Sequence, residues 1–263
     1  MKVVLFCGGQ GMRMRDYSST LPKPMIEIGS RPILWHVMKY YAYFGHKDFI
    51  LCLGYKGESI KAYFQNYDEC LSNDFVMYNG GQTLHLYNND IHDWSITFAD
   101  TGIYSNIGQR LMAVRKYLGG DDIFLANYSD GLTNLPLPEL VDFLKNSDKV
   151  GCFVSVRPNL NYHFITTTPE GVVTTIKNVK FTDHRINGGF FAFKKEIFDY
   201  IHDGEELVQE PFQRLIKKNK LLAYTYDGFW KAMDTFADKR EFNNLVEAGD
   251  TPWQLWNKVK LDL

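Results

Sequence analysis

The sequence predicts an α/β protein with a Rossmann-like, mixed but mostly parallel sheet flanked by helices. Three observations favour this class. Short apolar runs alternate with amphipathic, helix-like segments through the first half of the chain, an order that implies right-handed crossovers between parallel strands. A glycine-rich turn directly follows the first apolar run, and residues 123–128 form a nearly continuous apolar run. A run of the latter kind is typical of a central strand that is buried on both faces.

The elements follow from these patterns in chain order. In the first half we expect strands at residues 2–7, 49–53, 94–98 and 123–128, and helices at residues 32–44, 58–67, 108–118 and 136–145. The second half predicts a strand at 150–156, a small β-rich region over 164–193 with a turn at Glu170 and Gly171, helices at 195–201 and 210–218, a strand at 221–226 and a closing helix at 238–247.

Residues 70–93 break this alternation with polar, Asn-rich sequence and a Gly-Gly turn. We interpret them as an inserted excursion that forms a flap or a subunit contact. The chain contains no internal repeat and no low-complexity linker. We therefore expect a single domain over residues 1–263.

The bulk composition excludes several classes of protein. A net charge of −2 indicates no general attraction to nucleic acid or anionic membranes. The sequence MKVVLFCGG is too short for a signal peptide, and no run of about 18 apolar residues occurs. The 4 cysteines lack metal-ligand spacing, which predicts free, mostly buried thiols in a reducing compartment. We expect a soluble cytoplasmic protein, and the aromatic surplus with the 70–93 excursion predicts a homo-oligomer.

Residues 5–25, with the sequence LFCGGQGMRMRDYSSTLPKPM, carry the strongest functional signal. The glycines are Gly8, Gly9 and Gly11, and the cations that follow are Arg13, Arg15 and Lys23. Glycines let backbone N–H groups close around an anion, and the cations suit a nucleoside triphosphate. The stretch lacks the Gly-Lys-Ser/Thr ending of a P-loop and the third glycine of a dinucleotide-binding turn. A hydride-transfer enzyme is therefore disfavoured.

Two aspartates complete a candidate phosphoryl-transfer site. Asp130 follows the buried 123–128 strand, where a Mg²⁺ ion that bridges triphosphate oxygens would be held. Asp234 precedes a threonine near the end of the chain. Each has an ordinary alternative, because Ser-Asp-Gly also makes a good turn and Asp before Thr is common at helix starts. Together with the glycine loop they predict a metal-assisted site.

Several short segments, taken in their order along the chain, resemble those of the sugar-1-phosphate nucleotidylyltransferases. The resemblance covers nearly the whole chain. The matching segments are GGxGxR at 8–13, LPKPM at 21–25, GQR at 108–110, YSDG at 128–131, INGGFF at 186–191, QEP at 209–211, GFW at 228–230, MDT at 233–235 and PW at 252–253. The similarity is strongest to members that use CTP. It implies that a sugar 1-phosphate, glucose 1-phosphate first of all, attacks the α-phosphorus of CTP. The products would be a CDP-sugar for polysaccharide synthesis and pyrophosphate, with Mg²⁺ as cofactor.

The resemblance also implies roles for individual residues. Arg13 and Lys23 would be catalytic and neutralise the phosphates, while Asp130 and Asp234 would hold Mg²⁺. Arg110 would hydrogen-bond the cytosine edge, the alternative being a solvated helix-surface arginine. The nucleotide-binding set is Leu5, Cys7, Gly8, Gly9, Gly11, Met12, Ser105, Arg110 and Ser129. The acceptor-binding set in the β-rich region and around it is Asn187, Gly188, Glu210, Trp230, Lys177 and Lys180.

The segment that is expected to bind the acceptor departs from the family pattern. Where members carry Glu-Lys-Pro after the hairpin strand, residues 177–180 read Lys-Asn-Val-Lys. Met12 also stands where the family often has Thr or Ser, and Ser129 stands where it often has Gly. Two alternatives therefore stay open, namely a non-sugar phosphate or phosphonate as acceptor and a catalytically silent nucleotide-binding subunit. Retention of Arg13, Lys23 and both aspartates argues against the silent subunit.

Overall fold

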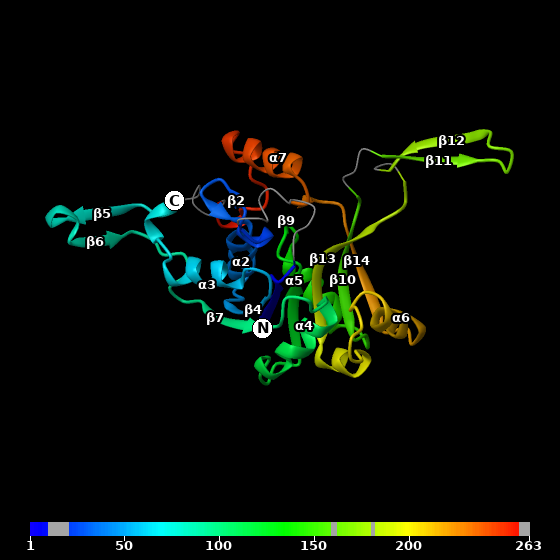
Figure 1. Cartoon of the computed structure of the whole chain (residues 1–263), viewed down its shortest axis with the longest axis horizontal. Helices are drawn as coiled ribbons and strands as arrows, with labels where there is room; N and C mark the ends of the chain where they lie inside the picture. The colour runs from blue at the N-terminus through cyan, green and yellow to red at the C-terminus, as the bar shows by residue number, and fades with distance from the viewer. Residues whose placement is uncertain (10–20, 159–161, 180–181, 258–263) are drawn as a thin grey trace.

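A seven-stranded sheet forms the centre of the molecule in the computed structural model, which describes residues 1–9, 21–158, 162–179 and 182–257 (Figure 1). Its strand order is β14-β10-β13-β8-β1-β4-β7. Neighbouring strands are parallel except at β13, which runs antiparallel to both β10 and β8. The strands are β1 (Lys2–Phe6), β4 (Asp48–Leu53), β7 (Ser95–Asp100), β8 (Ile123–Asn127), β10 (Gly151–Val156), β13 (Ile186–Lys194) and β14 (Leu221–Tyr226). The predicted α/β class and mixed sheet are confirmed.

Helices cover both faces of the sheet and enclose two separate apolar cores. They are α2 (Ile33–Tyr43), α3 (Gly57–Gln65), α4 (Ile107–Val114), α5 (Leu137–Lys145), α6 (Glu210–Lys217) and α7 (Phe236–Glu247). Successive residues of β1 alternate between the cores: Val3 and Leu5 pack in the core that includes α2, α5 and α7, whereas Val4 packs in the core that includes α4 and α6. This alternation follows from the period of two in a strand. No helix in the described ranges is long and apolar enough to span a bilayer.

Most predicted elements are found within a few residues of their expected ends. The strand expected at 221–226 is β14, and the central apolar run is β8. Two expected helices are shorter or tighter than predicted. Residues 108–118 give α4 followed by the 3₁₀ helix η5 (Arg115–Tyr117), and residues 195–201 form the 3₁₀ helix η7 (Lys195–Tyr200).

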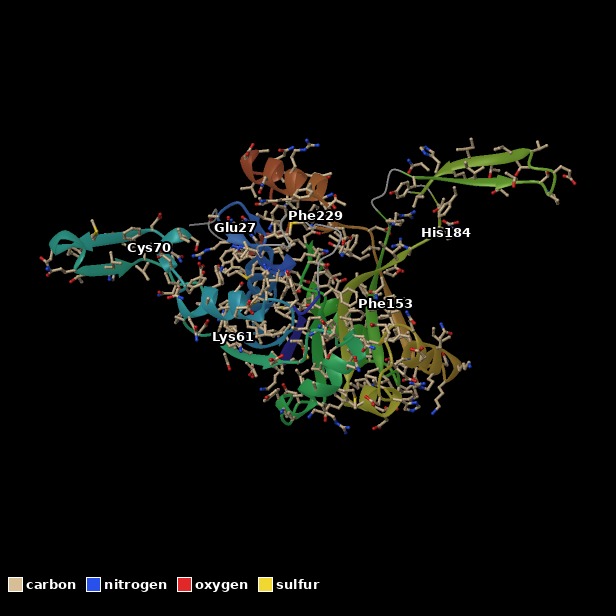
Figure 2. All side chains as sticks on the ribbon, in the orientation of Figure 1. Glu27, Lys61, Cys70, Phe153, His184 and Phe229 are labelled. Atoms are coloured by element: carbon tan, nitrogen blue, oxygen red, sulfur yellow. The ribbon has the colours of Figure 1, made fainter. Side chains whose placement is uncertain are left out.

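Two hairpins extend from opposite ends of the molecule (Figure 1). The first, β5 (Phe75–Tyr78) with β6 (Thr83–Leu86), lies in the 70–93 excursion between the 3₁₀ helix η3 (Glu69–Leu71) and β7, and its turn holds the 3₁₀ helix η4 (Asn79–Gly81). The second joins β11 (His163–Thr167) to β12 (Val173–Asn178), with the predicted turn at Gly171 in the left-handed region at φ 87°. Figure 2 shows side chains crowded over the central sheet and sparse along both hairpins.

Candidate active site

A small two-stranded sheet brings the two candidate metal ligands together. β9 (Gly131–Thr133) leaves the carboxyl end of β8 and pairs antiparallel with β15 (Trp230–Ala232). The Met233 N–H donates to the carbonyl of Asp130 at 2.9 Å and extends this pairing by one step. Asp130 and Asp234 therefore lie at the same end of the same small sheet, although they are far apart in the sequence.

Lys23 bridges these two carboxylates. Its Nζ donates to Asp130 Oδ2 at 2.7 Å and to Asp234 Oδ1 at 2.8 Å. The side chain is 16% exposed, against 27% for Asp130 and 42% for Asp234. A buried prolyl turn positions it, because Pro24 fills the second place of the 3₁₀ helix η2 (Lys23–Met25) and Ile26 N–H closes the turn on the Lys23 carbonyl. The structure thus joins three residues that the sequence predicted as site residues.

The charges of this cluster stabilise one another against the cost of partial burial. Burial disfavours the charged ammonium of Lys23, but the two carboxylates outweigh it and raise the pKa of Lys23 above its ordinary value. Burial raises the pKa of Asp130, and the adjacent Lys23 opposes that rise. The lysine consequently carries its positive charge at neutral pH.

The donor set suits Mg²⁺ in combination with a phosphorylated ligand. Two carboxylate oxygens converge on one point that a cation, the Lys23 ammonium, already occupies. Among the described residues no group of three or more His, Cys, Asp and Glu side chains could hold a metal ion alone. Mg²⁺ binds through one or two carboxylates and completes its shell with phosphate oxygens and water. Asp130 and Asp234 are thus sufficient for a metal that arrives with a nucleotide.

Arg110 is buried and donates hydrogen bonds at the carboxyl ends of β1, β4 and β7. Its side chain is among the buried polar groups at 2% exposure, so the surface alternative is wrong for this arginine. Nη1 donates to the carbonyl of Leu53 at 3.0 Å and to Thr101 Oγ1 at 2.7 Å, and Nη2 donates to the carbonyl of Gly8 at 3.0 Å. Burial beside these neutral acceptors lowers the pKa of Arg110. Its assignment as the cytosine-reading residue stays a prediction.

Gly8 makes room for this arginine. A Cβ atom added at Gly8 would lie 2.0 Å from Arg110 Nη1, whereas one added at Gly9 would meet no described residue within 4 Å. The sequence predicted the same role for both glycines, which was to let the backbone approach an anion. The structure shows that the two positions differ in their surroundings. Gly8 is required by the packing of a side chain, whereas none of the described residues would contact a Cβ atom at Gly9.

Four further nucleotide-binding candidates, Leu5, Cys7, Ser105 and Ser129, are among the described residues and lie at or near the carboxyl ends of strands. Leu5 and Cys7 are fully buried, and burial raises the pKa of Cys7 to about 12, which makes it an inert thiol. Ser129 has φ 63° and donates to the carbonyl of Phe6 at 2.8 Å. Its left-handed backbone explains why glycine suits this place. Ser105 donates to the carbonyl of Thr101.

Thr101 is a site residue that the sequence did not predict. Its Oγ1 donates to the carbonyl of Leu53 at 2.7 Å and accepts from Arg110. Its place directly after β7, in an Asp-Thr-Gly sequence at the carboxyl end of a strand, is the signal that could have identified it. Thr101 orients Arg110 and Ser105 at the same time.

Part of the acceptor set forms a second cluster beside β13. Asn187 Oδ1 accepts from the Gly189 N–H at 2.9 Å, and Gly189 has φ 76°. Trp230 Nε1 donates to the carbonyl of Gly188 at 2.8 Å. These contacts place Trp230, the first residue of β15, against the strand that carries Asn187. A hydrogen bond therefore joins the small sheet of β9 and β15 to β13, the strand that carries the predicted acceptor-binding residues Asn187 and Gly188.

Replacing Trp230 by phenylalanine tests this connection. The ring keeps its apolar contacts but loses the hydrogen bond to Gly188, so the free energy of unfolding should fall by about 1 kcal/mol. Chemical denaturation measures the change. Trp256→Phe serves as the matched control, because no hydrogen bond joins the Trp256 indole N–H to β13 in the described part of the chain. An equal loss in both variants would contradict a specific role for the Trp230 bond.

Two acceptor candidates lie apart from this cluster, and others cannot be placed. Glu210 is the exposed first residue of α6, and Lys177 is exposed on the projecting strand β12. Neither lies on the small sheet that carries the aspartates. Gly11, Met12, Arg13 and Lys180 lie outside the described residues, so their assignments stay predictions.

The fold and this site define a nucleotidyltransferase. Residues 2–248 match the family model described as nucleotidyl transferase, and the chain belongs to that family. The predicted family and enzyme class are confirmed.

Particular relatives share much of the chain. The protein is 37% identical over 257 residues to a glucose-1-phosphate cytidylyltransferase of Salmonella typhimurium, covering 97% of this chain and 100% of the relative. It is 26% identical to a mannose-1-phosphate guanyltransferase of Candida albicans, covering 88% of this chain and 60% of that protein. Among solved structures, HddC from Yersinia pseudotuberculosis matches with a TM-score of 0.64 at 19% identity over 93% of this chain and 99% of the other. The latter likeness concerns the fold alone.

Proposed function

We propose that this nucleotidyltransferase transfers CMP from CTP to a sugar 1-phosphate, with glucose 1-phosphate as the preferred acceptor. The convergence of Asp130 and Asp234 on Lys23 carries the proposal, since phosphoryl transfer depends on cations held among fixed carboxylates. The 37% identity to a relative named as a cytidylyltransferase, against 26% for one named as a guanyltransferase, supports CTP.

The chemistry needs positioning and charge neutralisation more than proton transfer. A phosphate monoester is already an anion near neutral pH, so no general base is required. Lys23 is the described cation nearest the aspartates and would bind the nucleotide phosphates. Mg²⁺, held by Asp130 and Asp234, would neutralise charge on the triphosphate. Arg110 and Gly8 would shape the place where the base enters.

Lys23 has two tasks in this proposal. Without nucleotide it serves as the counter-ion of both carboxylates, and with nucleotide it moves to a phosphate oxygen. Lys23→Met should therefore raise the affinity of the nucleotide-free protein for Mn²⁺ about tenfold, because the competing ammonium is gone. Electron paramagnetic resonance of free Mn²⁺ at pH 8 measures this binding. Lys61→Met, an exposed lysine of α3, is the control. Unchanged Mn²⁺ affinity in Lys23→Met would contradict the proposal that Lys23 is the counter-ion of both carboxylates in the absence of nucleotide.

The acceptor is tested by pyrophosphate release with CTP and Mg²⁺. The panel contains glucose 1-phosphate, other sugar 1-phosphates, and small non-sugar phosphates and phosphonates. Turnover with glucose 1-phosphate supports the proposal. Turnover only with a non-sugar compound would support the second candidate acceptor, which the altered 177–180 segment favours. Binding of CTP without turnover on any acceptor would support a silent subunit.

We also propose that the protein forms a homo-oligomer through the β5–β6 hairpin, in a reducing, cytoplasmic compartment. Met77 and Leu84 face each other across the hairpin and are 60% and 50% exposed. An isolated two-stranded hairpin is only marginally stable in water, and its apolar side chains favour a partner.

Replacing both Met77 and Leu84 by aspartate should convert the oligomer to monomers, because two charges would be buried at the contact. Light scattering after size-exclusion chromatography measures the mass. Thr174→Asp on the other hairpin is the control. Wild-type protein that elutes as a monomer at micromolar concentration would contradict the proposed assembly.

A further inference from the structure

The first turn of α7 holds the backbone of Asp234, one of the two candidate metal ligands. Asp238 Oδ2 accepts hydrogen bonds from the backbone N–H groups of Asp234 at 3.1 Å and of Thr235 at 2.8 Å. It also accepts from the Thr235 hydroxyl at 2.8 Å, and Thr235 Oγ1 accepts from the Asp238 N–H at 3.2 Å. One carboxylate therefore fixes the chain at Asp234 and at the residue that caps the helix.

The bond to Asp234 goes beyond helix capping. A capping box consists of the reciprocal bonds between the N-cap residue, here Thr235, and the third helical residue, here Asp238. The N–H of Asp234 lies one residue before the cap, and Asp238 binds it as well. On the other side, the Met233 N–H donates to the carbonyl of Asp130 at 2.9 Å. The backbone of Asp234 is thus held at its own N–H and at those of both neighbouring residues.

A buried lysine places the Asp238 carboxylate. Lys231 Nζ donates to Asp238 Oδ1 at 3.2 Å and to Glu241 Oε2 at 2.8 Å. The Lys231 side chain is 6% exposed, against 25% for Asp238 and 56% for Glu241. An ammonium at this depth needs its carboxylate partners, because an unpaired buried charge is costly. With Oδ1 held by Lys231, the second oxygen of Asp238 faces the N–H groups of Asp234 and Thr235.

Adjacent residues of β15 connect the site to two different elements. Trp230 donates to the carbonyl of Gly188 on β13, whereas the next residue, Lys231, reaches α7. Side chains of successive strand residues point to opposite faces, so one short strand can be tied on both sides. A lysine is ordinarily exposed, and the burial of Lys231 three residues before a metal ligand sets it apart.

We propose that Asp238 is a positioning residue for the metal site and that Lys231 holds it in place. Asp238 acts through Asp234, because it fixes the backbone from which the metal-binding carboxylate extends. This carboxylate and that of Asp130 then converge on one point, where the Lys23 ammonium lies. The inference rests on the metal role of Asp234 in the proposed function. Residues that orient metal ligands commonly contribute about 10–100-fold to metal affinity.

Mn²⁺ binding to the nucleotide-free protein, measured by electron paramagnetic resonance of free Mn²⁺ at pH 8, tests the inference without turnover. Asp238→Ala removes the acceptor of the Asp234 N–H and should weaken Mn²⁺ binding about tenfold. Glu241→Ala is the matched control, because it removes one negative charge and one partner of Lys231 but leaves Asp238 in place. It should bind Mn²⁺ within about twofold of the wild type. Equal weakening in both variants would refute the role of Asp238.

Lys231→Met separates positioning from charge. Loss of a positive charge near the site would by itself strengthen Mn²⁺ binding. Loss of the residue that places Asp238 should instead weaken Mn²⁺ binding about threefold or more. Unchanged or stronger binding in Lys231→Met would overturn the role of Lys231.

Thr235→Val separates positioning from helix capping. It removes the hydroxyl half of the capping box but keeps the bond between Asp238 and the Asp234 N–H. Thermal unfolding should show a lower melting temperature for both Thr235→Val and Asp238→Ala. Mn²⁺ binding, measured well below both melting temperatures, should weaken in Asp238→Ala alone. Equal weakening in the two variants would make Asp238 an ordinary capping residue and overturn the inference.

Asp234→Asn distinguishes failure of this inference from failure of the proposed function. It should weaken Mn²⁺ binding about tenfold or more, because one of two carboxylate ligands is lost. Wild-type Mn²⁺ binding by Asp234→Asn would contradict the metal role of Asp234 itself. Weakened binding by Asp234→Asn together with wild-type binding by Asp238→Ala would leave the metal role intact and refute positioning by Asp238.

Discussion

Replacing Asp130 by asparagine is expected to reduce turnover about a thousandfold, equivalent to ~4 kcal/mol of transition-state stabilisation. The amide keeps the size of the carboxylate but removes half of the charge that would hold Mg²⁺. It also leaves Lys23 with Asp234 as its one charged partner among the described residues. Pyrophosphate release at saturating CTP and Mg²⁺ measures the loss.

The fold should survive this change, because Asp130 lies at a solvent-accessible strand end and contributes its carbonyl, not its side chain, to the small sheet. Asp121→Asn, an exposed aspartate before β8, is the matched control and should retain full activity. Activity of Asp130→Asn near that of the control would remove Asp130 from the metal site. A lower melting temperature together with lost activity would instead assign it a structural task.

Replacing Gly8 by alanine should lower the free energy of unfolding by about 2–4 kcal/mol. The new methyl group would lie 2.0 Å from Arg110 Nη1, so the buried guanidinium would have to leave its acceptors at Leu53, Thr101 and Gly8. Gly9→Ala is the matched control in the same turn, because its methyl group would meet none of the described residues within 4 Å. Its stability should stay within about 0.5 kcal/mol of the wild type. Urea denaturation compares the two variants.

A double-mutant cycle isolates the cause of the Gly8 effect. If the clash with Arg110 is responsible, adding Arg110→Ala should make Gly8→Ala much less destabilising than it is alone. Additive losses would mean that Gly8 acts through its backbone and not through the arginine. Equal losses in Gly8→Ala and Gly9→Ala would likewise contradict the packing role of Gly8.

The central strands of the sheet, and the strand end that carries Asp130, could be predicted from the sequence because their signals are local. The apolar period of β1 and the continuous run of β8 follow from burial on two faces. An acidic residue at the end of such a strand, as Asp130 is, must lie near the ligand side of the sheet. Lys23 and Asp234 are candidates from their own segments, and the family resemblance then gives them roles at the same site as Asp130.

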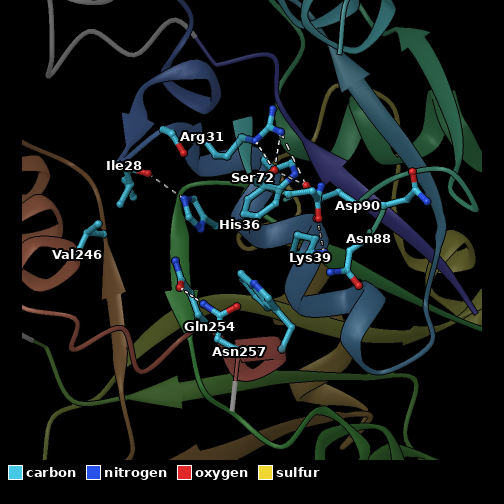
Figure 3. Close-up of a pocket in the computed structure, with 16 residues that line it drawn as sticks. Ile28, Arg31, His36, Lys39, Ser72, Asn88, Asp90, Val246, Gln254 and Asn257 are labelled. Atoms are coloured by element: carbon cyan, nitrogen blue, oxygen red, sulfur yellow. Dashed lines mark hydrogen bonds and ion pairs between the residues drawn. The ribbon is translucent and has the colours of Figure 1, made fainter. Parts of the chain in front are cut away.

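Other features depend on contacts between distant parts of the chain. The pairing of β9 with β15, which brings the aspartates together, joins two three-residue strands that have no period to detect. The burial of Arg110 depends on glycines at positions 8 and 54, where an added Cβ would approach the guanidinium. Asp90 accepts hydrogen bonds from Lys39 of α2 and from Ser72 in the excursion (Figure 3), so no single segment predicts them.

Pyrophosphate release with glucose 1-phosphate and Mg²⁺, compared among CTP, UTP, GTP and dTTP, tests cytidylyl transfer most directly. We predict that kcat/KM is highest for CTP by at least about tenfold, the factor that one hydrogen-bonded base edge supplies. Mass spectrometry of the CTP reaction should identify a CDP-sugar. Equal or faster turnover with another nucleotide, with CTP bound no better than the rest, would contradict the proposed function.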